Sequence, residues 1–243
     1  MSTYDFDRFV DRRAINAAKW GVPEGIIPMS VADTEFLSPP EIAEAIRERA
    51  AVASYGYSCM AQADYDAVLE WIATHQGQRV PREHLLSTPG VLYTMRVVMY
   101  ALTKPGDQVI VQTPLHTPSI GSAGLRQRVP VKNHLKRLPD GSYTFDLDDL
   151  ERCFRNGARV LMMCAPNNPT GRVWTMEELS GVAEVVKKYD AWIVSDEIHR
   201  DIVYHGHKHI PIATLPGMEE RAITVFSPSK TFNMGGFHIG SAI

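Results

Sequence analysis

The chain has 243 residues, of which 44% are apolar and 22% charged, with a formal net charge of −3. This length suffices for one large domain with a hydrophobic core or for two small ones. The charge offers no basic field for nucleic acid or an anionic membrane, and no apolar run is long enough to span a bilayer. The start lacks signal-peptide character, and Cys59, Cys153 and Cys164 lack metal-ligand spacing. We therefore expect a cytoplasmic protein with reduced thiols and no metal site.

Residues 1–37 contain several breakers of regular structure, and we expect an irregular arm or part of a small domain. Ser38-Pro39-Pro40-Glu41 then predicts a helix start, with Ser38 as its cap, and the helix runs to about Val52. A second amphipathic pattern spans residues 64–75. Residues 38–243 are expected to form one large domain that is incomplete, because the chain stops inside an apolar run.

Further along the chain, helical patterns alternate with apolar runs. Predicted helices begin at Gly90, Thr117, Asp146 and Thr175, and Thr175 forms a capping box with Glu178. Predicted strands span residues 109–111, 129–131, 159–164, 192–194, 223–225 and 236–243. Such alternation predicts an α/β fold, with a mostly parallel sheet and helices on both of its faces.

Two loops that follow predicted strands are candidate binding segments, because ligands of open α/β sheets sit at the carboxyl ends of the strands. Gly90 opens a helix whose free N–H groups and dipole can bind a phosphate, although most such glycines only make turns. Residues 166–171 contain Asn168 and follow a buried strand, with an ordinary turn as the competing interpretation.

Asp196 and Lys230 also lie at strand ends. A buried carboxylate needs a partner, but an Asp that merely caps the next turn explains Asp196 equally well. Lys230 follows the apolar run 222–226, and taken alone it is better interpreted as a solvated surface lysine. The candidate groups at the other strand ends favour a functional role for Lys230 instead.

Together, these four groups match one ligand that carries a phosphate, a ring oxygen, a basic ring nitrogen and an aldehyde, namely pyridoxal 5′-phosphate. Lys230 is the expected catalytic residue, bound covalently to the aldehyde carbon. Asp196 would keep the ring nitrogen protonated, and Asn168 would donate to the ring oxygen. The expected phosphate ligands are Gly90, the N–H groups of Val91 and Leu92, Ser227 and Ser229.

Three motifs in this order, Asn168-Pro169-Thr170-Gly171, Ser195-Asp196-Glu197 and Ser229-Lys230, resemble the class I/II aminotransferases of pyridoxal-phosphate fold type I. Flanking stretches are similar to the MalY/PatB-like C–S lyases, the cystathionine β-lyase type. They include Val31-Ala32-Asp33, Tyr55-Gly56-Tyr57, Gly206-His207-Lys208-His209-Ile210-Pro211 and Ser229-Lys230-Thr231-Phe232-Asn233. The resemblance covers nearly the whole chain and implies the large domain of that fold, without the small C-terminal domain.

The resemblance implies roles for three more residues. His199 stands where aminotransferases carry a Tyr that contacts the ring oxygen, with a surface or capping histidine as the alternative. Tyr57 would reach the phosphate of a neighbouring subunit, which implies a homodimer with shared sites, although a core aromatic explains it almost as well. His116 takes the place of the aromatic residue that stacks on the cofactor ring.

Several positions depart from the family pattern. Ser30 replaces a Trp, Thr34-Glu35 replaces Met-Asp, and Ala165-Pro166-Asn167 replaces Asn-Pro-His. His238 occupies the position of a phosphate-binding Arg in many aminotransferases. The Arg that clamps the substrate carboxylate belongs to the missing C-terminal domain, so we expect these 243 residues alone to turn over poorly.

The expected activity is a β-lyase that cleaves L-cystathionine or a related cysteine S-conjugate to a thiol, pyruvate and ammonia. An aminotransferase would use the same residues and differ in where the proton returns. From another class, a cofactor-binding regulatory protein or an inactive fragment is the alternative, although no helix-turn-helix is apparent. The expected partners are an amino-acid substrate and a second copy of the chain, and neither nucleic acid nor a membrane.

Overall fold

The computed structural model describes residues 4–243, which form two compact units. The first unit contains the described part of residues 1–59 together with Pro228–His238. The second contains Met60–Ser227 and Ile239–Ile243, and it holds the main β-sheet. No helix among the described residues is long and apolar enough to cross a membrane.

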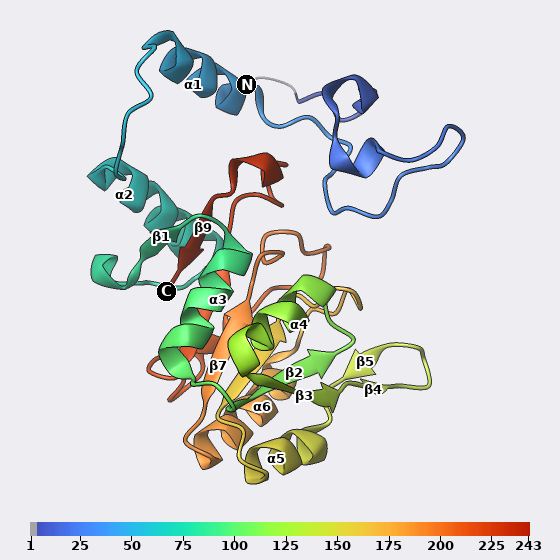
Figure 1. Cartoon of the computed structure of the whole chain (residues 1–243), viewed down its shortest axis with the longest axis vertical. Helices are drawn as coiled ribbons and strands as arrows, with labels where there is room; N and C mark the ends of the chain where they lie inside the picture. The colour runs from blue at the N-terminus through green and yellow to red at the C-terminus, as the bar shows by residue number, and fades with distance from the viewer. Residues whose placement is uncertain (1–3) are drawn as a thin grey trace. The chain divides into compact units, whose positions relative to one another are not determined.

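Within residues 4–243, seven strands form the main sheet in the order β1-β9-β8-β7-β6-β2-β3 (Figure 1). The strands are β1 Leu86–Thr88, β2 Gln108–Thr113, β3 Val129–His134, β6 Val160–Cys164, β7 Trp192–Asp196, β8 Ala222–Phe226 and β9 Gly240–Ala242. From β8 to β3 all neighbours are parallel, whereas β9 is antiparallel to both β1 and β8. The mostly parallel sheet predicted from the sequence is confirmed.

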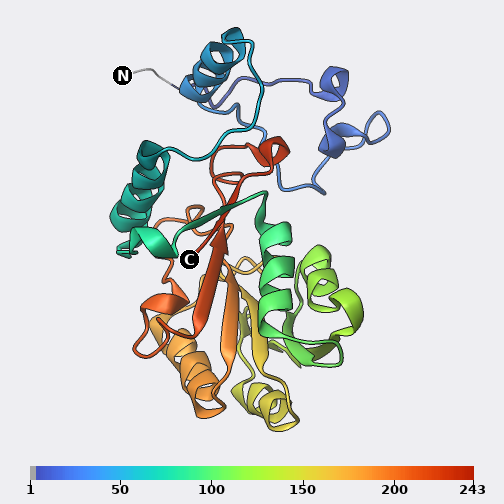
Figure 2. The same cartoon turned by 60° about the vertical axis from the view of Figure 1, so that its left-hand side comes forward.

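Helices cover both faces of this sheet, as predicted (Figure 2). Helices α3 (Val91–Leu102) and α4 (Thr117–Ala123) pack on one face, and α5 (Leu147–Arg155) and α6 (Met176–Lys188) pack on the other. The alternation of side chains along a strand produces this division. Val109 and Val111 of β2 join the cluster with α3, whereas Ile110 joins the cluster with α5 and α6.

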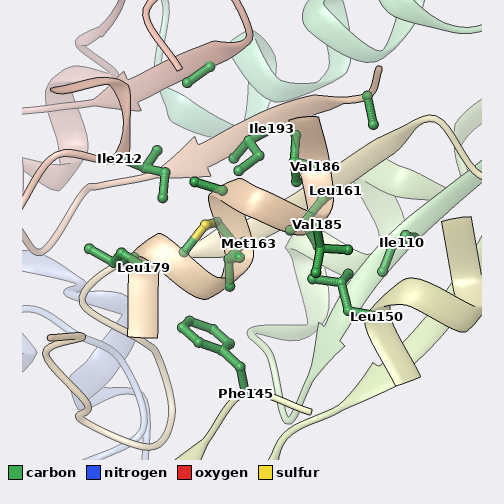
Figure 3. Close-up of a cluster of buried hydrophobic side chains, with 14 of the residues drawn as sticks. Ile110, Phe145, Leu150, Leu161, Met163, Leu179, Val185, Val186, Ile193 and Ile212 are labelled. Carbon is green, nitrogen blue, oxygen red and sulfur yellow. The ribbon is translucent and has the colours of Figure 1, made fainter. Parts of the chain in front are cut away.

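The larger hydrophobic cluster lies between the sheet and the pair α5 and α6 (Figure 3). Strand residues Ile110, Leu161, Met163 and Ile193 contribute to it, and helix residues Leu150, Leu179, Val185 and Val186 cover them. Burying branched and aromatic side chains of this size contributes about 1.5–3 kcal/mol each. The parallel strands that end at the candidate site are therefore anchored along their length.

The second unit contains two smaller features. Helix α2 (Gln62–Trp71) continues directly into a π-helical turn, Ile72–Gln76, and Ile72 packs with Leu85 and Phe226. Strands β4 (Lys136–Arg137) and β5 (Tyr143–Thr144) form a hairpin around a turn that contains Asp140 and Gly141. Short 3-10 helices span Arg82–His84, Leu125–Gln127 and Ile212–Thr214.

The first unit is mostly irregular. It contains α1 (Pro40–Ala51) and the 3-10 helices Arg13–Ile15, Ala18–Trp20 and Gly235–Phe237. The prediction that Ser38 caps α1 is wrong, because Pro39 takes the cap position and the Ser38 hydroxyl donates to the carbonyl of Asn233 at 3.2 Å. The predicted strand 236–243 is also too long, since only Gly240–Ala242 pair in the sheet.

Candidate active site

The candidate residues of the second unit gather at one edge of the sheet because of strand direction. Strands β2, β6, β7 and β8 are parallel, so their carboxyl ends share this edge. Strand β1 points the same way as β8, because each is antiparallel to β9. Asp196 ends β7 at this edge, and the loops that begin here carry Gly90, His116, Asn168 and Ser227.

The start of α3 at Gly90 has its backbone held on both sides. Gly90 precedes the helix with a φ of 103°, and its carbonyl accepts from the Thr94 N–H at 3.0 Å and the Thr94 hydroxyl at 2.8 Å. A Cβ at Gly240 would lie 2.8 Å from the Gly90 backbone, so only glycine allows β9 this close approach. The N–H groups of Val91 and Leu92 have no acceptor within the helix, as at any helix start. They are therefore available to an anion.

The loop after β6 is organised by Asn167, the residue before the predicted one. The Asn167 carboxamide oxygen accepts from the hydroxyl of Thr170 at 2.8 Å and from its N–H at 3.2 Å. Asn167 is buried, and its side-chain nitrogen has no hydrogen-bond partner among residues 4–243. Asn168 is half-buried, and its carbonyl accepts from the N–H of His116 at 3.1 Å. Asn167 thus fixes the turn, while Asn168 and His116 are brought together at its rim.

Asp196 is the last residue of β7 and is buried beside Cys164, its register partner on β6. One carboxylate oxygen accepts from the N–H of Ile198 at 3.2 Å, so the capping interpretation is correct in part. Burial raises the pKa of Asp196 to about 7, with a smaller contribution from the charge of Glu197, while the Ile198 bond acts in the opposite sense. No residue of the described chain forms an ion pair with Asp196. A cationic ligand group beside Asp196 would offset the free-energy cost of keeping its buried carboxylate ionised.

A second buried carboxylate, Glu197, lies next in the chain, and no role for it was predicted from the sequence. Glu197 is fully buried, 2.9 Å from His209 Nε2 and 3.1 Å from the Ser195 hydroxyl, which donates to it. Its N–H donates to the Val225 carbonyl at 2.8 Å. The signal available in the sequence was a Glu directly after a buried strand, since buried charges are paired. His209 is the partner.

His199 and Arg200 follow in the same loop. His199 is half-buried, and the structure leaves open both its predicted role at the ring oxygen and the capping alternative. Arg200 is buried with its guanidinium carbon 3.7 Å from the centre of the Phe226 ring. Burial lowers the pKa of Arg200, opposed by the charges of Glu197 and Asp201. A buried cation therefore lies in the loop that carries Glu197 and directly follows Asp196.

Ser227 follows β8 directly and is buried. Its hydroxyl donates to the carbonyl of Ile239 at 2.6 Å. A hydroxyl has one proton to donate, so Ser227 could donate to a phosphate only after releasing this acceptor. The bond also joins the two strands' ends, because Ile239 leads into β9.

Tyr57, Ser229 and Lys230 belong to the first unit. The turn that carries Lys230 is closed by bonds from the Phe232 N–H to the Pro228 carbonyl at 3.0 Å and from the Met234 N–H to the Ser229 carbonyl at 2.8 Å. Lys230 is half-buried in this turn. The side chain of Tyr57 is exposed, so the alternative interpretation of Tyr57 as a core aromatic is wrong.

Comparison with known proteins places this geometry in a family. The sequence model of class I and II aminotransferases matches residues 24–243. The chain is 36% identical to cystathionine β-lyase PatB of Bacillus subtilis over 98% of its own length and 64% of that protein's. It is 37% identical to mouse kynurenine–oxoglutarate transaminase 3, over 70% of its own length and 39% of the transaminase.

A solved structure agrees with both sequence matches. Cystalysin of Treponema denticola, whose crystal structure contains pyridoxal 5′-phosphate, superposes with a TM-score of 0.94 at 30% identity. The superposition covers all of this chain and 64% of cystalysin. The chain thus spans about two thirds or less of the length of these relatives. With the family match over most of the chain, it belongs to the class I and II aminotransferase family.

Proposed function

We propose that the protein carrying this chain is a pyridoxal-phosphate-dependent C–S β-lyase. It would cleave L-cystathionine or a related cysteine S-conjugate to a thiol, pyruvate and ammonia. The observation that carries the proposal is Asp196, a buried carboxyl group without an ion pair at the edge where the helix start at Gly90 also lies. The names of PatB and of other C–S lyases among its relatives support the choice of reaction.

The residues of the second unit fit this cofactor. The free N–H groups of Val91 and Leu92 suit a phosphate. The carboxyl of Asp196, whose pKa burial raises, suits a protonated pyridine nitrogen, because that cation would restore the charged carboxylate. Asn168 can donate to the ring oxygen, His116 can lie against the ring, and His199 is a further candidate contact. Ser227 and Ser229 are proposed as additional phosphate ligands.

Lys230 is the proposed catalytic residue. It would bind the cofactor's aldehyde carbon through its amine, which must be neutral to attack. When bound, the cofactor's pyridine ring accepts the electron pair left at Cα as the proton departs. Lys230, once displaced by the substrate amine, would take that Cα proton as a general base. The Cβ–S bond then breaks, the thiol leaves with a proton, and water converts the three-carbon remainder to pyruvate and ammonia.

An aminotransferase is the second candidate, favoured by the 37% identity to kynurenine–oxoglutarate transaminase 3. The roles of Asp196, Asn168 and Lys230 would be the same. The difference is that Lys230 would return the proton to another carbon instead of allowing the Cβ–S bond to break.

A homodimer and a cytoplasmic location are part of the proposal. The first unit exposes large apolar side chains, among them Phe9, Ile15, Ile27, Met29 and Tyr57. Apolar side chains exposed in this unit would be covered in a contact with a second copy of the chain, which supports the proposed dimer. Tyr57 would serve the phosphate of the neighbouring subunit. The division into an arm, residues 1–37, and a large cofactor-binding domain, residues 38–243, is retained as a prediction.

Two measurements test the proposal in the whole protein. Incubation with cystathionine should release pyruvate without an added keto acid, whereas amino transfer that requires a keto acid, with no pyruvate, would contradict the lyase assignment. The protein should also show the visible absorbance of a lysine-bound cofactor, and Lys230→Ala should abolish that band. The matched control is Lys208→Ala, which changes an exposed lysine and should keep it.

A further inference from the structure

The turn that carries Lys230 is attached to the N-terminal segment 33–38 by one side chain. Asn233 lies three residues after Lys230, and its carboxamide nitrogen donates to the carbonyl of Phe36 at 2.9 Å and to that of Thr34 at 3.3 Å. In return, the Asn233 carbonyl accepts from the Ser38 hydroxyl at 3.2 Å. Three bonds thus join residues almost 200 positions apart in the chain.

The same carbonyls are held from a second direction by Arg12. This buried guanidinium donates to the carbonyls of Thr34 at 2.5 Å, Glu35 at 2.8 Å and Phe36 at 3.1 Å. The carbonyl of Thr34 therefore accepts two donors, and that of Phe36 accepts three, because the Thr34 hydroxyl also donates to it at 3.5 Å. Segment 33–38 is thus a fixed platform, to which Asn233 ties the turn.

The backbone of Asn233 suits this attachment. Its φ is 55°, in the left-handed region that Asn adopts more readily than other residues with a side chain. Close packing supports the same contact two residues later, because a Cβ at Gly235 would lie 3.3 Å from a carboxylate oxygen of Asp33. The backbone bonds from Phe232 to Pro228 and from Met234 to Ser229 connect residues on either side of Lys230. They therefore link the position of Lys230 to that of Asn233.

We propose that Asn233 is a positioning residue for Lys230, and that segment 33–38 sets the orientation of the Lys230 turn through the Asn233 carboxamide. This rests on the proposed function, in which Lys230 binds the cofactor. Thr34 and Glu35, where the sequence departs from the family pattern, contribute backbone carbonyls to the platform, and the Glu35 side chain pairs with Lys19 at 2.5 Å. Because these contacts use backbone carbonyls, a change of side chain at position 34 or 35 does not remove them.

The test replaces the donor while keeping the size of the side chain. Asn233→Asp places a carboxylate oxygen opposite two carbonyls and retains tolerance for the left-handed backbone. Hydrogen exchange followed by mass spectrometry should speed up at least tenfold in both 31–38 and 228–238. The matched control is Asn16→Asp, the same change at another left-handed Asn of the first unit, which is exposed. Asn233→Gly, which keeps the φ and removes the side chain, should act in the same direction as Asn233→Asp.

A second measurement separates positioning from plain structural support. The pH midpoint of the visible cofactor band should shift in Asn233→Asp, and kcat should fall about tenfold with a smaller change in KM, while Asn16→Asp changes neither. Unchanged exchange in 31–38 would overturn the proposal, and so would faster exchange with an unaltered pH midpoint and kcat. Failure of the proposed function is distinct, because it appears as a visible band that survives Lys230→Ala, whatever the exchange result.

Discussion

The two units hold their candidate residues by different means. In the second unit, Asp196 and Ser227 are placed by strands whose backbone bonds run to both neighbours, and hydrophobic clusters cover both faces. In the first unit, Lys230 lies in a turn that is tied to an irregular segment by side-chain bonds: the Asn233 carboxamide donates to that segment, and Ser38 of the segment donates back to the turn. Regular ladders tolerate changes in individual side chains, whereas the Lys230 turn depends on particular donors. We therefore expect a substitution in the sheet unit to change the stability of that whole unit. A substitution in the first unit should change only the segments next to it.

The largest effect on stability is expected where the sheet unit depends on a single polar pair. His209→Ala leaves the fully buried Glu197 without its imidazole partner and should lower the free energy of unfolding by about 3–5 kcal/mol. His209→Gln, which retains an N–H donor, should cost less. Urea unfolding measures both, with the exposed His207→Ala as the control. If His209→Ala lowered the free energy of unfolding by less than about 1 kcal/mol, the sheet unit would tolerate the loss of this buried polar pair as well.

Asp196→Asn should stabilise the cofactor-free protein at high pH. The pKa of Asp196 is raised from 3.8 to about 7 in the folded state, so the carboxyl favours folding below pH 4 and this contribution is lost as the pH rises through 7. A shift of this size corresponds to about 4 kcal/mol. Urea unfolding of the cofactor-free proteins at pH 5 and pH 8 should show a larger gain for Asp196→Asn at pH 8. Equal gains at both pH values would contradict the raised pKa.

Arg12→Ala should loosen the first unit while leaving the sheet unit folded. It removes charge-assisted bonds to the carbonyls of Thr34, Glu35 and Phe36, each worth about 1.5–3 kcal/mol when intact. Limited proteolysis should then cut within residues 4–38 at least tenfold faster. The neighbouring Arg13→Ala removes an exposed pair with Asp11 and a cation–π contact with the Trp20 ring at 4.8 Å, but no bond to these carbonyls, and serves as the control. A matching loss in the global free energy of unfolding would show that the two units melt together.

The smallest effect is expected at the capping box of α6. The Thr175 hydroxyl accepts from the Glu178 N–H at 3.2 Å, and the Glu178 carboxylate accepts from the Thr175 N–H at 2.9 Å. Thr175→Ala should lower the free energy of unfolding by about 1 kcal/mol, and Thr175→Ser should restore most of it. Urea unfolding measures both variants. Equal free energies of unfolding for Thr175→Ser and Thr175→Ala would contradict a stabilising role of the Thr175 hydroxyl.

Much of the second unit could be predicted from local pattern. The apolar runs at 109–111, 159–164, 192–194 and 223–225 are each confirmed as strands, because buried parallel strands are continuously apolar. The capping box at Thr175 was equally visible. Strand β1 was missed, since it has only three residues, its Leu86 is exposed, and its partner lies about 150 residues later.

The candidate site divides in the same way. The sequence predicted that Asn168 follows a strand and that Asp196 lies at a strand end, because strands and loops alternate along the chain. The pairing of Glu197 with His209 did not, because the intervening loop gives no periodic signal. The role of Asn233 could not be predicted either, because its acceptors are backbone carbonyls, which carry no sequence signature. Long-range polar contacts of this kind require the fold.

The place of β9 has a consequence for synthesis on the ribosome. Strand β1 pairs only with β9 in the described sheet, so residues 86–88 wait without a β-partner until residues 240–242 have been translated. The helix start at Gly90 is enclosed at the same moment, because Gly240 is the residue that closes against it. A nascent chain could therefore assemble β2, β3, β6, β7 and β8 first, while the surroundings of the helix start at Gly90 would be completed only after residues 240–242 have been translated.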